Sequence, residues 1–284
     1  MKTRWILIAL IVLSITALGQ RTILKPGMNN YSPADDIKLG QQAAKEAEKS
    51  LTLINDREVT TYVAALGQKL VSKAPNSNNF PFTFKVVNEK EINAFALPGG
   101  PVYVNRGAIE AADNEAQIAG VMGHEIAHVV LRHGTNQASK GDLLGSLAGA
   151  VGGLFGGRTG QVAAAGGGLA ANITLLRYSR DAESQADLMG TQILYDLGYA
   201  PRATAEFFDK LAKEHKGSSV EQWFSNHPIP ENRVAKVNAE IKKLGPEPTD
   251  PKIDTPEFQR IKKALLAMPA PKPKSKASAN TGGD

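Results

Sequence analysis

The chain has 284 residues, of which 42% are hydrophobic, 33 are lysine or arginine and 28 are aspartate or glutamate. This length and composition suit one good-sized globular domain with additional ends. The formal net charge of +5, or +3 without Lys2 and Arg4, is too small to indicate nucleic-acid binding. The absence of cysteine excludes thiolate metal ligands and a lipoprotein anchor.

Residues 1–19 have the pattern of a secretory signal peptide. Lys2 and Arg4 precede an apolar run over residues 5–18, which is short for a membrane span, and Ala17-Leu18-Gly19 provides small residues for cleavage. We therefore expect an exported, periplasmic protein. The alternative is a protein anchored to the inner membrane by an uncleaved N-terminal segment.

The body of the chain predicts a mostly helical α+β domain. Residues 20–35 read as an extended lead-in, and residues 36–268 as the domain itself. Apolar residues at helical spacing predict helices over residues 34–53, 57–73, 116–133, 201–216, 231–244 and 255–268. Alternating residues predict strands over residues 80–88, 92–97 and 102–105, the last two joined by Pro98-Gly99-Gly100. An exposed edge strand of such a sheet could pair with an extended peptide.

The most informative motif is His124-Glu125-Ile126-Ala127-His128. On a helix, histidines four residues apart project from one face, so both can bind one zinc ion. The glutamate between them is then placed to take a proton from an activated water. This helix is apolar on both sides, which predicts burial, and two buried histidines and a glutamate need partners. The alternative is a surface helix that carries the pattern by accident.

A glycine-rich stretch at 142–173 follows this helix. Neither half of it is long enough to span a membrane. We interpret it as a helical hairpin or a mobile flap beside the cleft, with contact to lipid or to an outer-membrane partner as a weaker alternative.

The third metal ligand must be histidine, aspartate or glutamate, since there is no cysteine. Glu183 and Asp187 are four apart at the start of a helix, so they share a face. Glu183 would bind the metal, and Asp187 would receive the N–H of a ligand histidine and fix its tautomer. The alternative is a helix start whose acidic residues only complement the dipole.

Two further features lie towards the C-terminus. His227, in Asn226-His227-Pro228, could donate to the oxyanion of a tetrahedral intermediate, or it could simply be a packed loop histidine. Residues 269–284 are rich in proline and lysine and predict a disordered tail.

Together these motifs resemble peptidase family M48, the gluzincin metalloendopeptidases of the HtpX and CAAX prenyl protease type, and most of all its exported BepA-type members. The resemblance runs over residues 36–245 and includes Asn93-Ala94-Phe95-Ala96-Leu97-Pro98-Gly99-Gly100. It implies a zinc-binding helix packed beside a small β-sheet and a catalytic zinc ion. It also implies extended or unfolded polypeptide substrates and an envelope or outer-membrane assembly partner.

The resemblance also implies a role for each site residue. His124, His128 and Glu183 would bind zinc and Glu125 would be the general base. Asp187 would support a ligand histidine. His227 would face the open zinc position, as a transition-state donor or as an inhibitory extra ligand. Arg233 would lie near it and help hold that loop or the oxyanion as a further catalytic residue. The segment formed by Asn93, Ala94, Phe95 and Ala96 would be the edge strand that lines the substrate cleft.

The function expected from the sequence is hydrolysis of peptide bonds in misfolded or unassembled envelope proteins. Two alternatives remain open. One is a chaperone or assembly scaffold with a structural zinc ion, against which the intact Glu125 argues. The other is a processing enzyme dedicated to one substrate, which the sequence does not distinguish from a quality-control peptidase.

Overall fold

The computed structural model describes residues 20–140, 178–214, 223–228 and 232–269. The helices within these ranges are α2 (Pro33–Ala47), α3 (Arg57–Val71), α4 (Arg106–Ala111), α5 (Glu115–Val130), α6 (His133–Ser139), α10 (Arg180–Asp196), α11 (Ala203–Glu214), α13 (Arg233–Leu244) and α14 (Pro256–Ala267). A 3-10 helix covers Ser77–Asn79, and residues 223–226 form a helical turn. The strands are β1 (Thr83–Val87), β2 (Ala94–Ala96) and β3 (Pro101–Asn105).

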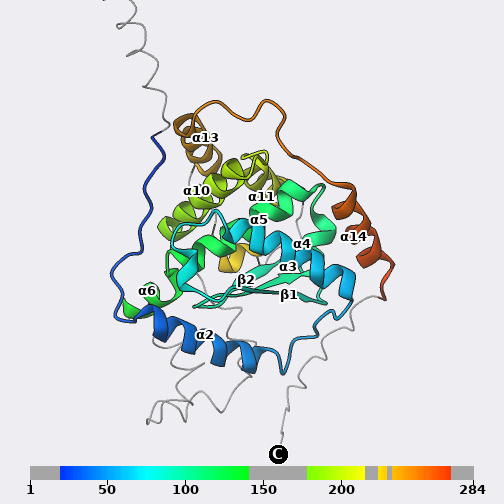
Figure 1. Ribbon diagram of the computed structural model, residues 1–284, viewed down its shortest axis with the longest axis horizontal. Helices are drawn as coiled ribbons and strands as arrows, with labels where there is room; N and C mark the ends of the chain where they lie inside the picture. Colours follow the sequence, from blue (N-terminus) through cyan, green and yellow to red (C-terminus); the bar gives the residue numbers. More distant parts are fainter. Residues whose placement is uncertain (1–19, 141–177, 215–222, 229–231, 270–284) are drawn as a thin grey trace, which may run out of the picture.

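The three strands form one sheet in the order β1-β3-β2, with β1 parallel and β2 antiparallel to β3. The predicted turn at Pro98-Gly99-Gly100 is confirmed, and both glycines adopt positive φ. Side chains alternate between the faces of the sheet. Figure 1 shows α2 on one side of the sheet and α3 and α5 on the other. Phe95 and Tyr103 pack with α2, whereas Ala94 and Val104 join the main core with α3 and α5.

Helix α5 is the centre of the domain. Asn114 caps its first turn by accepting a hydrogen bond from the backbone N–H of Gln117, and every residue from Glu115 to Val130 is buried. Helices α3, α10 and α11 and the sheet all pack around it. The predicted fold, mostly helical with a central helix beside a small sheet, is confirmed.

Two predicted helix ends are wrong. The first helix ends at Ala47 instead of continuing to residue 53, because Leu53 pairs with Val87 at the end of β1. The central helix ends at Val130 rather than His133. Arg132 adopts a left-handed conformation with φ of 56°, and His133 begins the separate helix α6.

Three expectations fall outside the described residues: the signal peptide at 1–19, the glycine-rich stretch at 142–173, and the tail beyond Pro269. In the part of the chain that the structure does describe, no helix combines the length and the apolar character that crossing a bilayer requires.

Candidate metal centre and active site

Seven predicted site residues converge from separate elements of the domain. Helix α5 provides the histidine pair and Glu125, α10 provides the two acidic residues, and His227 and Arg233 come from the turn before α13 and from its first residue. All are buried, with exposed fractions from 0 to 6%: His124, Glu125, His128, Glu183, Asp187, His227 and Arg233. The fold therefore brings together side chains that lie up to 109 positions apart in the sequence, from residue 124 to residue 233.

Four of these residues aim ligand atoms at one point. The Nε2 atoms of His124 and His128 are 3.0 Å apart, and the carboxylate oxygens of Glu183 lie 3.3 and 3.4 Å from them. The Nδ1 atom of His227 lies 3.3 Å from Nε2 of His124 and 3.1 Å from Oε1 of Glu183. All four ligand atoms fall within 4.8 Å of one another.

This donor set fits a divalent metal ion. Bonds of about 2.0–2.1 Å in tetrahedral zinc sites place neighbouring ligand atoms about 3.3–3.4 Å apart, close to the separations of His124, His128 and Glu183. Two buried imidazole nitrogens that face each other at 3.0 Å need a shared proton or a metal ion between them. Histidine and carboxylate ligands with no cysteine are typical of catalytic zinc.

A layer of charge surrounds the ligands. Asp187 accepts a hydrogen bond from Nδ1 of His124 at 3.1 Å and another from Nε of Arg233 at 2.6 Å. The expectation that Asp187 faces a ligand histidine thus agrees with the geometry. Burial disfavours the charged form of His124, but the carboxylates of Glu183 and Asp187 outweigh it and raise the pKa of this imidazole to about 10. Metal binding would therefore release a proton from this cluster.

The surroundings of Glu183 favour the charged form of its carboxyl despite complete burial. Burial alone would raise the pKa of this carboxyl, but the neighbouring His227 and His124 hold it well below its ordinary value. An ionised carboxylate at this point is the form that binds a metal ion.

Glu125 is different because, within the described part of the chain, its carboxylate makes no hydrogen bond and has only a longer ionic contact, with His227. Both oxygens are buried, and neither has a hydrogen-bond partner among the described residues. Burial raises the pKa of this carboxyl, against the lowering influence of His227 and His124. Nε2 of His227 lies 3.5 Å from Oε1 of Glu125. A buried carboxylate that makes no hydrogen bond and lies beside a set of metal-ligand atoms is suited to general base catalysis.

His227 is held in place by a stack of aromatic rings. The ring of Trp223 lies 4.2 Å from that of His227 and nearly parallel to it. The ring of Phe208 stacks on the ring of Trp223 at 4.9 Å. The guanidinium of Arg233 lies over Phe208 at 4.5 Å. His227 is therefore packed by aromatic rings and also lies within the group of residues that could hold a metal ion.

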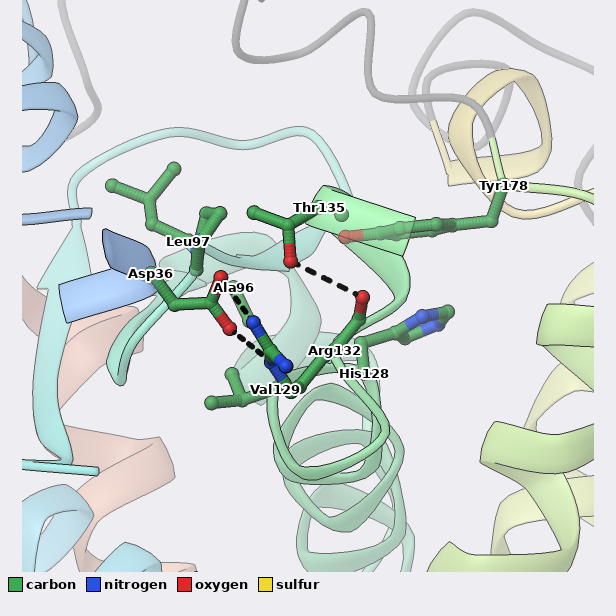
Figure 2. Close-up of a pocket in the computed structure, with 10 residues that line it drawn as sticks. Asp36, Ala96, Leu97, His128, Val129, Arg132, Thr135 and Tyr178 are labelled. Atoms are coloured by element: carbon green, nitrogen blue, oxygen red, sulfur yellow. Dashed lines mark hydrogen bonds and ion pairs between the residues drawn. The ribbon is translucent and has the colours of Figure 1, made fainter. Parts of the chain in front are cut away.

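The expected substrate strand lies at an edge, as predicted, but it is not open. Strand β2 pairs only with β3 in the described sheet. The four residues Asn93, Ala94, Phe95 and Ala96 are 2, 0, 7 and 3% exposed, so the expectation of an exposed edge is wrong for this state. A small pocket lies where the strand ends, between Ala96 and the side chains of His128 and Tyr178 (Figure 2).

Sequence reasoning missed two neighbours of the ligands. Nδ1 of His133 lies 2.9 Å from Nδ1 of His128, a contact that the spacing of the sequence motif does not predict. Burial lowers the pKa of His133 to about 4, so this ring is neutral near pH 7. The ring of Tyr178 stacks on His128 at 3.9 Å. The only sequence signal for these neighbours was the predicted burial of α5, because buried histidines need hydrogen-bond or packing partners.

The comparisons with known proteins agree with this site. The model of Peptidase family M48 matches residues 57–241, which include every predicted metal, base and cleft residue. The beta-barrel assembly-enhancing protease of Escherichia coli (strain K12) is 32% identical over 225 residues, covering 77% of this chain and 46% of that protein. The chain thus spans about half the length of this relative.

Two further relatives from the same organism are similar over most of their length. Metalloprotease LoiP is 28% identical over 84% of this chain and 96% of that protein, and Metalloprotease YcaL is 26% identical over 77% and 86%. The prediction of a metallopeptidase is confirmed at the level of the family. The family match covers more than half of the sequence and all of the converging residues, and on that evidence the chain belongs to peptidase family M48.

Proposed function

We propose that this chain is an exported zinc metalloendopeptidase that cleaves unfolded or extended segments of envelope proteins. The observation that carries the proposal is the convergence of His124, His128 and Glu183 on one buried point beside Glu125, whose carboxylate makes no hydrogen bond among the described residues. The name of the Escherichia coli relative, a beta-barrel assembly-enhancing protease, supports substrates or partners among proteins that assemble into β-barrels. The signal-peptide pattern of residues 1–19 supports export to the periplasm.

His124, His128 and Glu183 would hold the metal ion. When bound, the ion would polarise the scissile carbonyl and make water more acidic. Glu125 would take a proton from the attacking water onto a carboxylate oxygen and deliver it to the leaving amine. Asp187 would keep the proton of His124 on Nδ1, which leaves Nε2 free to bind metal.

His227 has two candidate roles, as a transition-state donor or as an inhibitory ligand. Its Nδ1 atom stands among the ligand atoms, and its Nε2 atom faces Glu125, so it covers the place where water and substrate would react. This position supports the inhibitory role in a resting state. The ring would then have to leave the cluster before a peptide could bind.

Arg233 fits a supporting role better than contact with the oxyanion. Its Nε atom donates a hydrogen bond to Asp187, and its Nη2 atom lies 3.5 Å from Oε2 of Glu183. The guanidinium would balance the two buried carboxylates and hold α13 against α10. Asn93 to Ala96 would pair with the substrate backbone once the cleft opens.

The test is cleavage of an unfolded protein, such as reduced casein, by the purified chain. We expect internal cleavage that is lost with a chelator and restored by zinc. Cleavage that survives full removal of the metal would contradict the proposal. A folded, zinc-loaded protein that never cleaves would favour the scaffold alternative.

The variant His227→Ala separates the two roles of His227 in the same assay. If His227 is an inhibitory ligand, its removal should raise the cleavage rate. If it is an oxyanion donor, its removal should lower kcat by about 10²–10³-fold.

A further inference from the structure

The outer nitrogen of the ligand candidate His128 is bound by a second histidine. Nδ1 of His128 and Nδ1 of His133 are 2.9 Å apart, and the two residues are 2% and 6% exposed. On its far side, Nε2 of His133 lies 3.4 Å from Oε1 of Gln185 on α10. A short relay of polar groups thus runs from the donor set to the helix that carries Glu183.

The turn between α5 and α6 creates this contact. The backbone of Arg132 adopts the left-handed conformation, so the chain changes direction after α5. The ring of His133 is thereby brought back to the side of His128. The guanidinium of Arg132 is held by both carboxylate oxygens of Asp36 and by the carbonyl of Tyr31. Figure 2 shows Asp36 and Arg132 joined in this way beside His128. The unfavourable backbone conformation is therefore stabilised by a largely buried ion pair.

The direction of each hydrogen bond follows from the chemistry of the site. Nε2 of His128 faces the other ligand atoms, so it must offer a lone pair to a metal ion, and the proton of the neutral ring must then sit on Nδ1. That N–H can donate only if Nδ1 of His133 accepts. The proton of His133 is then on Nε2, from which it donates to the amide oxygen of Gln185.

We propose that His133 is a positioning residue that fixes the tautomer and orientation of His128, with Gln185 fixing His133 in turn. This inference rests on the metal site of the proposed function. The two helix ligands are then supported differently. His124 relies on the carboxylate of Asp187, and His128 relies on a neutral imidazole. The neutral partner orients its ligand without adding a third carboxylate near Glu183 and Asp187.

The first test measures the zinc affinity of the full chain by competition with a chromogenic chelator. The amide oxygen of asparagine can take the place of Nδ1 of histidine as an acceptor, whereas leucine offers none. We expect His133→Leu to weaken zinc binding by about 10–100-fold. His133→Asn should retain most of the wild-type affinity. The matched control is Tyr62→Phe, which deletes a buried hydrogen bond to Glu115 at the other end of α5 and should leave the affinity unchanged.

The second test needs no variant and reads the tautomers directly. In ¹⁵N spectra of the zinc-loaded wild-type chain, His128 should carry its proton on Nδ1 and His133 on Nε2. A proton on Nδ1 of His133 would overturn the inference even if His133→Leu fails to fold.

The outcomes also separate the inference from the proposed function. A wild-type chain that binds no zinc would overturn both. A wild-type chain that binds zinc, with His133→Leu binding equally tightly, would overturn the role of His133 and leave the metal site in place.

Discussion

Glu125 is placed by its position within α5 and activated by its surroundings. His124 and His128, one residue before it and three after it, turn their rings to the donor set, while the carboxylate of Glu125 makes no hydrogen bond among the described residues. Such a group is costly to bury, and proteins retain it where it performs chemistry. The raised pKa of Glu125 follows first from burial.

That raised pKa predicts the acid side of the pH profile. A general base works only when deprotonated, so activity should be lost as the pH falls through the pKa of Glu125. Because burial raises this pKa above the ordinary value of 4.5, the acid limb of kcat/KM should lie above pH 4.5. The measurement is peptide hydrolysis across pH with bound metal determined at each point. Full activity at pH 4.5 in metal-loaded protein would contradict this expectation.

Helices α5 and α10 carry the three candidate metal ligands, and they cross at a pair of glycines. A Cβ atom on Gly190 would lie 3.2 Å from the backbone nitrogen of His124, whereas one on Gly123 would lie 3.6 Å from the nearest atom of α10. The contact at Gly190 is tighter than an ordinary Cβ contact, and because its neighbour is helix backbone, it is relieved only by a shift of the helix itself. The helix spacing that brings Glu183 to the histidines thus depends on Gly190.

The two glycines therefore predict opposite results for the same substitution. Gly190→Ala should force the helices apart, lower stability by about 1–3 kcal/mol and weaken zinc binding. Gly123→Ala should be tolerated, since an ordinary contact replaces empty space and alanine favours helix. Chemical denaturation and chelator competition on both variants provide the check. Equal behaviour of the two variants would show that the crossing does not set the ligand geometry.

Periodicity made much of this site predictable. Residues four apart on a helix share a face, so the pairing of His124 with His128 and of Glu183 with Asp187 follows from spacing. The role of His133 did not follow, because it depends on the left-handed turn at Arg132 and on a tertiary ion pair.

Other features also depended on contacts between distant segments. The first helix ends early because Leu53 pairs with Val87. The burial of the edge strand at Ala94–Ala96 depends on packing that alternation alone does not reveal.

At the scale of the whole molecule, the N-terminal strap, defined as residues 20–32, ties distant helices together. Thr22 donates through its backbone N–H and its hydroxyl to Glu240 on α13, and its carbonyl accepts from Gln192 on α10. Further along, Asn29 donates to Thr135 on α6. Figure 1 shows this strap as the blue segment running from α13 past α6 to α2. The strap thus links the helix that carries Arg233 to the one that begins with His133.

From the contacts of the strap, we expect substitutions at two neighbouring residues to lower the free energy of unfolding by different amounts. Thr22→Val removes the hydroxyl bond to the buried carboxylate of Glu240 and should cost about 1–3 kcal/mol of unfolding free energy. Arg21→Ala removes an ion pair with Asp196 that is largely exposed and should cost less than about 1 kcal/mol. Urea denaturation of both variants tests this. A larger loss for Arg21→Ala would mean that the strap is held by its surface charge instead.

In the proposed mechanism, Glu125 is the general base at a metal site built by His124, His128 and Glu183. The most direct measurement compares wild-type chain with Glu125→Gln, each shown to be folded and to hold the same amount of zinc, in the cleavage of one unfolded protein. We expect the variant to lose activity by at least about 10²–10⁴-fold, the usual contribution of a general base. Cleavage by Glu125→Gln at the wild-type rate would contradict it.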